Sequence, residues 1–259
     1  MNRRISTPLL LCATAALVIP LGACSDDSDS GTSSAVPTAQ TACAQLGGTK
    51  IAASAIGLPT TGGDVRSASL VLATDPGNTN GEYCKVLAAI HPVDAAAPDI
   101  NIEVNLPTSW NGKALQRGGG GYNGTLVTGL TQVPYGPVTG PTPLAQGYAT
   151  LGSDSGHVGA IADGTFALND EALANFGGNQ LKKTHDAALA LMQARYRKAP
   201  TRFYFAGNSQ GGHEAFNVVQ RWPQDYDGAI AIHPVYDFTL LQADGNYLAK
   251  AMYANGGAG

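Results

Sequence analysis

The motif Gly207-Asn208-Ser209-Gln210-Gly211 places a serine between two glycines. An apolar, strand-like run, Arg202 to Ala206, precedes it, and a helix-like run, His213 to Trp222, follows it. A serine on such a sharp strand-to-helix turn exposes its hydroxyl, and the backbone N–H of the next residue is free to stabilise an oxyanion. The motif therefore predicts that Ser209 is a nucleophile in acyl transfer and that Gln210 is one oxyanion donor. A glycine-rich turn with an incidental serine is the alternative interpretation.

Four consecutive glycines, Gly118 to Gly121, follow a short run typical of a strand over residues 113–116. In hydrolases with a G-x-S-x-G turn, a loop after an early strand supplies the second oxyanion N–H. Glycine suits this role because it lets the backbone approach a reacting group closely. We therefore expect Gly119 or Gly120 to be the second donor. The alternative is a merely flexible turn.

A serine nucleophile needs a base, usually histidine, which an acid holds in place. Asp154 and His157 resemble such a pair, but they precede Ser209 in the chain. In hydrolases with a G-x-S-x-G turn the usual order is serine, acid, histidine. We expect these two residues to support the pocket through hydrogen bonds. His213 and His233 follow Ser209 but lie on the very next helix and strand, too early for the usual base. The sequence thus predicts no catalytic acid or base within residues 1–259.

Strand-like and helix-like runs alternate along the chain. Strands are expected over residues 100–106, 113–116, 148–152, 203–206 and 228–232, and helices over 181–197 and 213–222. This alternation predicts the α/β class, with a mostly parallel sheet flanked by helices on both faces.

The composition excludes some functions. A chain of 259 residues allows one large domain or two small ones, and its formal net charge of −4 provides no basic field for nucleic acid. No cluster of cysteines and histidines has the spacing of a metal site. We expect neither a metal nor a cofactor in this chain.

The N-terminus has the pattern of a targeting segment. Arg3 and Arg4 precede an apolar stretch, Leu9 to Leu21, that is too short to cross a bilayer comfortably. The following Gly22-Ala23-Cys24 resembles a bacterial lipoprotein cleavage box, which predicts a signal peptide over 1–23 and lipidation of Cys24. The alternative is an ordinary secretory signal cleaved near Ala23. Both interpretations predict an exported protein, either anchored in the bacterial cell envelope through the lipid or secreted.

The next segment, residues 24–42, is rich in serine, threonine and aspartate and reads as a flexible linker. The folded domain is expected over 43–259. Its two cysteines, Cys43 and Cys84, would lie in an oxidising compartment, where a disulfide between them is the simplest prediction. Two buried free thiols are the alternative.

Several segments in order resemble the tannase/feruloyl esterase family of α/β-hydrolases. The similar segments are Glu82-Tyr83-Cys84-Lys85-Val86, the run from Leu106 to Lys113 that leads into the glycines, Ser153-Asp154-Ser155-Gly156-His157, the run from Phe205 to Gly212, and the run from Gln220 to Gly228. The resemblance implies a serine esterase that acts on aromatic esters of the galloyl or feruloyl kind through an acyl-enzyme.

The chain departs from the family pattern in two ways. Many members carry a cysteine just before the serine, bonded to a cysteine beside the catalytic histidine, and Asn208 stands there instead. Members also usually continue past the serine with a lid, often with a calcium site, and then the catalytic acid and histidine. We therefore expect a partial α/β-hydrolase domain with little or no turnover by itself.

Two other possibilities stay open at this point. The chain could be a non-catalytic, lipid-anchored binding protein that keeps a degenerate hydrolase pocket. Alternatively, the partial domain could fail to fold by itself, because an open strand edge and an uncovered apolar face favour aggregation.

Overall fold

The computed structural model describes residues 38–254 and 256–257. The predicted signal peptide, Cys24 and most of the predicted linker lie outside these residues. Where the linker enters them, the prediction is wrong: residues Ala39–Ala44 form helix α1. Thr38 caps this helix by accepting a hydrogen bond from the Thr41 N–H, and Cys43 is buried. The folded part thus begins before the expected boundary at Cys43.

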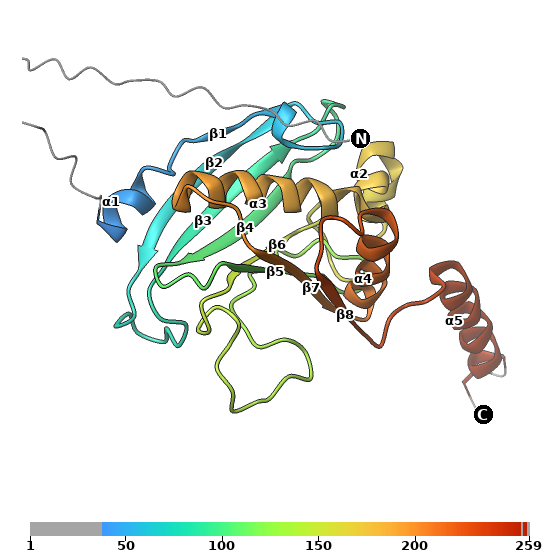
Figure 1. Ribbon diagram of the computed structural model, residues 1–259. Helices are drawn as coiled ribbons and strands as arrows, with labels where there is room; N and C mark the ends of the chain where they lie inside the picture. Colours follow the sequence, from blue (N-terminus) through green and yellow to red (C-terminus); the bar gives the residue numbers. More distant parts are fainter. Residues whose placement is uncertain (1–37, 255, 258–259) are drawn as a thin grey trace, which may run out of the picture. The chain divides into compact units, whose positions relative to one another are not determined.

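Eight strands and five α-helices, with three shorter helical turns, make up the described residues (Figure 1). In chain order they are α1 (Ala39–Ala44), β1 (Lys50–Ile51), η1 (Ala53–Ala55), β2 (Gly62–Val71), β3 (Tyr83–His91), β4 (Ile100–Pro107), β5 (Lys113–Arg117), β6 (Ala149–Ser153), η2 (Thr165–Leu168), α2 (Asp170–Ala174), η3 (Asn175–Asn179), α3 (Gln180–Tyr196), β7 (Arg202–Asn208), α4 (Gln210–Arg221), β8 (Gly228–Ile232) and α5 (Phe238–Tyr253). The expected strands and helices all occur, with boundaries shifted by a few residues.

The strands form one sheet in the order β1-β2-β3-β4-β6-β5-β7-β8. The α/β class is confirmed, but the described sheet is mixed rather than mostly parallel. Strands β1 to β4 and the β4–β6 pair are antiparallel, and only the pairs among β6, β5, β7 and β8 are parallel. Short connections between β2, β3 and β4 produce the antiparallel part, because they are too short for a crossover helix.

The antiparallel part holds much of the core. Strand β4 is buried on both faces apart from Asn101, although its alternating sequence predicts only one buried face. The predicted disulfide is confirmed: it joins Cys43 in α1 to Cys84 in β3, with the two Cα atoms 5.5 Å apart. The N-terminal helix is thus covalently fixed to a central strand.

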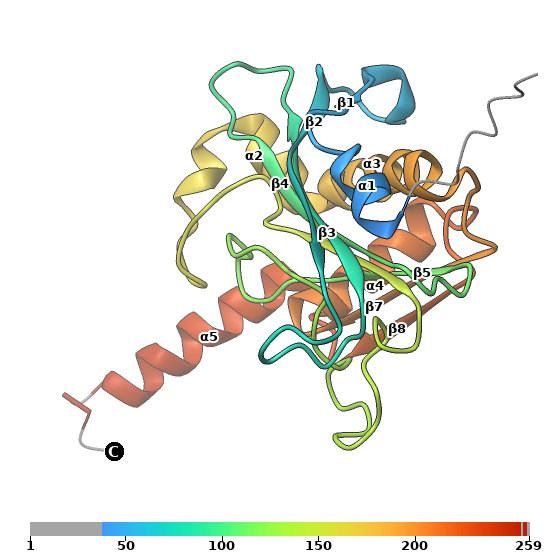
Figure 2. The ribbon, with the colours of Figure 1, turned by 90° about the vertical axis from the view of Figure 1, so that its left-hand side faces the viewer.

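Helices α3 and α4 pack on the sheet and on each other, α3 over β3, β4 and β6 and α4 over β7 and β8 (Figures 1 and 2). Helix α3 ends where Arg197 adopts a left-handed conformation, just before Pro200. On the opposite face of β5, β7 and β8, part of the long loop after Arg117 takes the place of a helix. The sheet face near the C-terminal strands is therefore only partly covered.

Helix α5 follows β8 and has no buried residue. Phe238 is half-buried, whereas apolar side chains farther along the helix, among them Leu240, Leu248 and Met252, are half or more exposed to solvent. Among the described helices, none has both the length and the apolar character needed to cross a membrane.

Candidate active site

Ser209 lies at the junction between β7 and α4, in the conformation that the motif predicts. Its backbone has φ 59° and ψ −117°, a strained combination for a residue with a side chain. Its N–H donates to the Ile232 carbonyl at 3.0 Å, which fixes the turn to the end of the neighbouring strand β8. The serine is thus held on a rigid strand-to-helix turn.

The glycines around Ser209 are required by close backbone contacts. A Cβ on Gly207 would lie 2.1 Å from the Gly211 carbonyl oxygen, and one on Gly211 would lie 2.8 Å from the Gly119 oxygen. A Cβ on Gly118 would in turn lie 2.7 Å from the Cα of Gly211. The glycine run, Gly118–Gly121, is therefore packed directly on the first turn of α4, and the Gly211 N–H donates to Gly119 O at 3.1 Å.

A cavity of about 420 Å³ opens beside Ser209. Four segments line it: the glycine run and its neighbour Tyr122, the loop after β6, the strand-to-helix turn Gly207–Gly211 (called the elbow below), and the segment that leads into and begins α5. The lining residues are Gly121, Tyr122, Ile161, Ala162, Ser209, Gln210, Val235, Phe238, Leu241 and Gln242. No lining residue is an aspartate, glutamate, lysine, arginine or histidine, so the cavity suits an uncharged, largely apolar group.

The predicted oxyanion donors do not all have a free N–H. Gln210 is the first residue of α4, where an N–H has no partner within the helix. The Gly119 N–H, in contrast, donates to the Glu214 carboxylate at 2.9 Å. Of the two predicted glycines, only Gly120 remains a candidate oxyanion donor. A Cβ placed on Gly120 would meet only open space.

Asp154 and His157 lie close in sequence but do not hydrogen-bond each other. The Asp154 carboxylate accepts bonds from the Asn101 N–H and side chain and from the Gly156 N–H. Burial raises the pKa of this carboxyl, against those hydrogen bonds. His157 donates from Nε2 to the Tyr122 carbonyl at 2.7 Å and stacks on Phe166. Both residues thus fix loops next to the cavity.

The two histidines after Ser209 point to other partners. The Nδ1 atom of His213 lies 2.8 Å from the Val235 carbonyl, and that of His233 lies 3.3 Å from Asn208 Oδ1. Neither histidine lines the Ser209 cavity. The arrangement therefore offers a half-buried serine that lines a cavity, together with backbone donors, but no base directed at the serine from these two positions.

Aromatic side chains cluster around one wall of the cavity. Tyr122 has its ring centroid 5.7 Å from that of Phe238 and 6.1 Å from that of Phe176, and Phe176 lies 5.1 Å from Phe166. Edge-to-face and tilted contacts of this kind stabilise aromatic groups and accept a further ring readily. The sequence did not mark these residues, since they come from four separate segments.

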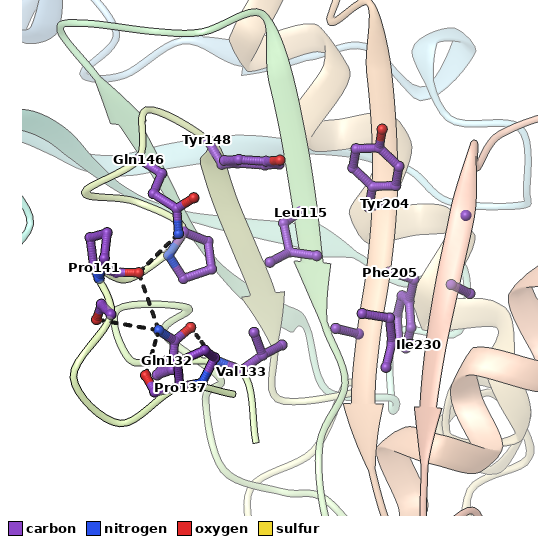
Figure 3. Close-up of a pocket in the computed structure, with 15 residues that line it drawn as sticks. Leu115, Gln132, Val133, Pro137, Pro141, Gln146, Tyr148, Tyr204, Phe205 and Ile230 are labelled. Atoms are coloured by element: carbon purple, nitrogen blue, oxygen red, sulfur yellow. Dashed lines mark hydrogen bonds between the residues drawn. The ribbon is translucent and has the colours of Figure 1, made fainter. Parts of the chain in front are cut away.

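A second cavity, of about 600 Å³, lies on the other face of β5, β7 and β8 (Figure 3). Leu115, Tyr204 and Ile230 from the strands face a proline-containing loop across it. In that loop, Gln132 Nε2 donates to the Pro141 carbonyl at 3.1 Å, and Gln146 Nε2 donates to the same oxygen at 2.9 Å. This cavity shares no lining residue with the Ser209 cavity.

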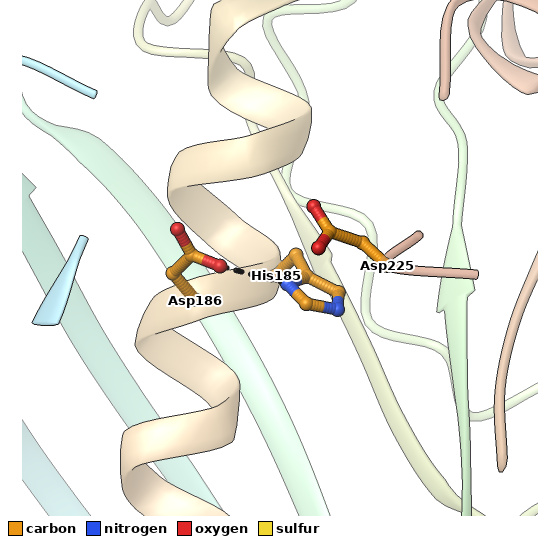
Figure 4. A group of neighbouring side chains, drawn as sticks. All are labelled: His185, Asp186 and Asp225. Carbon is orange, nitrogen blue, oxygen red and sulfur yellow. Dashed lines mark hydrogen bonds and ion pairs between the residues drawn. The ribbon is translucent and has the colours of Figure 1, made fainter. Parts of the chain in front are cut away.

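One group of side chains in the described residues has the composition of a metal site. His185, Asp186 and Asp225 bring possible ligand atoms within 4.8 Å of one another (Figure 4). Lys182 Nζ lies 2.9 Å from Asp186 Oδ1 and 2.8 Å from Asp225 Oδ2, so the two carboxylates already share a cation. His185 Nδ1 bonds Asp186 at 2.9 Å. We interpret the group as an ion-paired cluster that fixes α3 to the segment before β8.

Like the aromatic residues, Glu214 was not recognised from the sequence. Its side chain is 1% exposed and accepts hydrogen bonds from the Gly119 N–H and from the side-chain amides of Asn123 and Gln180. A signal was present, because Glu214 shares the buried face of its helix with Gly211, Ala215 and Val218. A glutamate on the buried, apolar face of a helix is costly unless it has hydrogen-bond partners, so its position in the sequence indicates a polar contact.

Comparison with known proteins places the chain in a family. The profile of the family "Tannase and feruloyl esterase" matches residues 84–259. An uncharacterized esterase of Agrobacterium fabrum is 49% identical over 218 residues, which cover 84% of this chain and 39% of the relative. A mono(2-hydroxyethyl) terephthalate hydrolase of Piscinibacter sakaiensis is 30% identical, over 66% of this chain and 30% of that protein. The chain thus spans well under half the length of these relatives.

Solved structures agree in fold. The tannin acyl hydrolase of Aspergillus niger has a TM-score of 0.58 at 21% identity, over 78% of this chain and 39% of that one. Feruloyl esterase B of Aspergillus oryzae has a TM-score of 0.56 at 24% identity, over 75% of this chain and 37% of that one. At these identities the likeness shows the fold. Together with the profile match and the Agrobacterium relative, it shows that the chain belongs to the tannase and feruloyl esterase family.

Proposed function

We propose that this chain carries the nucleophile and the oxyanion site of a carboxylic ester hydrolase, with Ser209 as the nucleophile. The observation that supports this most is the backbone of Ser209, with φ 59° at the start of α4, beside a cavity of about 420 Å³. Such a turn presents the hydroxyl to a bound ester and leaves the N–H of the next residue free.

In the proposed reaction, Ser209 Oγ attacks the ester carbonyl, and the N–H groups of Gln210 and Gly120 stabilise the resulting oxyanion. The alcohol leaves with a proton, and an acyl-enzyme remains. Water then attacks the acyl group, which departs as the carboxylic acid and regenerates the Ser209 hydroxyl. Asp154 and His157 take no part in proton transfer in this scheme; they hold the loops that form the cavity.

We propose that the ester carries an aromatic group. Tyr122 and Phe238 line the cavity and belong to the aromatic cluster that includes Phe166 and Phe176. A planar ring gains most from such surroundings. The names of the relatives agree with this class, since they include feruloyl esterases and a terephthalate monoester hydrolase.

The proton of Ser209 needs a base, and we propose that none of the described histidines supplies it. His213 and His233 are turned toward Val235 and Asn208. Loss of members of a catalytic triad lowers rates by about 10⁴ to 10⁶. We therefore expect slow turnover by residues 1–259 alone. The acid and base would come from sequence like that of the longer relatives.

The test uses two proteins, the chain itself and a fusion that adds the part of the Agrobacterium relative that follows the matched segment. We expect the fusion to hydrolyse methyl ferulate or methyl gallate, and Ser209→Ala to reduce its rate by about 10⁴-fold or more. Hydrolysis by the fusion that survives Ser209→Ala would contradict the role of Ser209. Rapid, Ser209-dependent hydrolysis by the chain alone would place the base within it.

We also propose export and lipid anchoring through Cys24, which lies outside the described residues. The sequence around Cys24 and the disulfide between Cys43 and Cys84 support this proposal, because disulfides persist in oxidising compartments. Labelling with a fatty acid in a bacterial host should mark the chain and not its Cys24→Ala variant. Equal labelling of both would exclude the anchor.

A further inference from the structure

We propose that Glu214 is a positioning residue that holds the glycine run, Gly118–Gly121, on the elbow helix and so shapes the oxyanion site beside Ser209. The inference rests on the proposed function, because it assigns to Glu214 a role in building that site. Glu214 lies in α4, does not line the Ser209 cavity, and is not itself proposed to touch substrate.

The contacts of the carboxylate join three separate segments. Oε2 accepts from the Gly119 N–H at 2.9 Å. Oε1 accepts from Asn123 Nδ2 at 2.7 Å and from Gln180 Nε2 at 3.2 Å. The Gly119 N–H is thereby committed to Glu214, which fixes the orientation of the Gly118–Gly119 peptide. The next peptide, which carries the Gly120 N–H, is held through the Gly119 carbonyl by the Gly211 N–H. Because a Cβ on Gly118 would lie 2.8 Å from Oε2, the carboxylate and the glycine run fit closely.

The same carboxylate connects the glycine run to the loop that carries Asp154 and His157. Asn123 Nδ2, which bonds Glu214, also donates to Ser155 Oγ at 2.6 Å. Gln180 in turn accepts a bond from Ser153 Oγ at 2.6 Å. A substitution at Glu214 would therefore disturb both the glycine run and the loop after β6, which line the Ser209 cavity.

The hydrogen-bond partners of Glu214 indicate that the ionised carboxylate is the form that holds the glycine run. All three partners of Glu214 are N–H donors, so a protonated carboxyl would have to give up one of its acceptor positions. The neighbouring titratable group is Tyr226, whose pKa is held well above its ordinary value by burial, so it stays neutral near pH 7. Asn123 and Gln180 carry no charge, and His213 on the same helix is turned to Val235.

Burial raises the pKa of Glu214 to about 7, against the hydrogen bonds from Asn123, Gly119 and Gln180. The carboxylate form is thus populated mainly above pH 7, and protonation below it would loosen the bond to Gly119. The oxyanion site would then be most ordered on the alkaline side of neutrality. This dependence would originate from a residue that transfers no proton to substrate.

The experiment is amide NMR of the isotope-labelled full chain between pH 5 and pH 9. We expect the Gly119 amide signal to titrate with a midpoint near pH 7 in the wild type, and this titration to vanish in Glu214→Gln. We also expect protection of the Gly119 N–H from hydrogen exchange at pH 8 to fall about ten- to a hundredfold in that variant. The control is Glu103→Gln, which alters another glutamate that is 1% exposed but lies on β4; it should keep the Gly119 titration.

Each alternative result has a distinct meaning. Unchanged protection of the Gly119 N–H in Glu214→Gln, or a Gly119 titration that persists unchanged in that variant, would overturn the role of Glu214, and neither depends on turnover. A wild-type Gly119 signal that does not titrate would overturn the pH dependence. In the active fusion described above, Glu214→Gln should lower kcat more than it raises KM and should flatten the acid limb of the rate profile. Absence of Ser209-dependent hydrolysis in the fusion would instead count against the proposed function, and the amide titration would still decide on Glu214.

Discussion

The two ends of the sheet are built differently. At the antiparallel end, β3 and β4 are almost wholly buried, and a disulfide ties β3 to α1. At the parallel end, β8 is nowhere fully buried, and Ile230 is 56% exposed. Yet the parallel end carries Ser209 and the close glycine contacts. The comparison shows that the part with the chemistry is not the part with the most buried surface, so stability and reactivity should respond to different mutations.

The largest expected effect lies in the elbow. Gly207→Ala would place a methyl group 2.1 Å from a backbone oxygen, and we expect it to cost upwards of about 4 kcal/mol or to prevent folding. Gly120→Ala, in open space at the same site, should change the free energy of unfolding by less than about 0.5 kcal/mol. Urea unfolding measures both. Equal effects would show that the elbow is not tightly packed.

The next effect belongs to the antiparallel end. Replacing Cys43 and Cys84 together by serine opens a loop whose ends are 41 positions apart, and we expect a loss of about 3 to 4 kcal/mol. The cavity beside Ser209 should keep its shape, because neither cysteine lines it. Comparing the free energies of unfolding of the wild type and the double variant measures this loss. Unfolding the wild type with and without a reducing agent provides a second measurement. Altered amide signals around Ser209 in the double variant would show that the two ends are coupled.

The smallest effect concerns pH. The Asp99 and Asp64 carboxylates bond both ring nitrogens of His91, at 2.8 and 2.6 Å, and the bond from Asp99 above all raises the pKa of His91. Because the folded pKa exceeds the unfolded value, this contribution is complete below about pH 6.5 and is lost as pH rises through the folded pKa.

The cluster around His91 is partly exposed, so we expect His91→Gln to cost about 1 kcal/mol or less at pH 5 and still less at pH 9. Thermal unfolding at the two pH values, compared with wild type, measures this difference. A larger cost at pH 9 than at pH 5 would contradict the proposed ion pairs.

Local patterns in the sequence predicted the parts of the site that are local in the chain. The elbow was found because a strand, a serine turn and a helix follow one another within about twenty residues, and the structure has that arrangement at Ser209. The disulfide followed from the predicted export to an oxidising compartment and from the small number of cysteines. Residues 38–42 were wrongly assigned to the flexible linker. The helix-capping residue Thr38 is only a weak indication of a helix when it lies in a polar stretch.

Contacts between distant segments could not be predicted in the same way. The antiparallel end was missed because strand order depends on which segments pair in space, and β6 lies between β4 and β5. The bond from Gly119 to Glu214 joins residues 95 positions apart. The sequence therefore proposed Gly119 as a donor without any sign that its N–H is already engaged.

The backbone contact between the glycine run and the elbow also limits how this site can diversify. Side chains are excluded at Gly118, Gly207 and Gly211, so these positions offer almost no room for inherited variation. The opposite wall, with Ile161 and Leu241, comes from a surface loop and an exposed helix, where substitutions are readily tolerated. New ester preferences, in nature or in directed evolution, should therefore arise on that wall while the elbow stays unchanged.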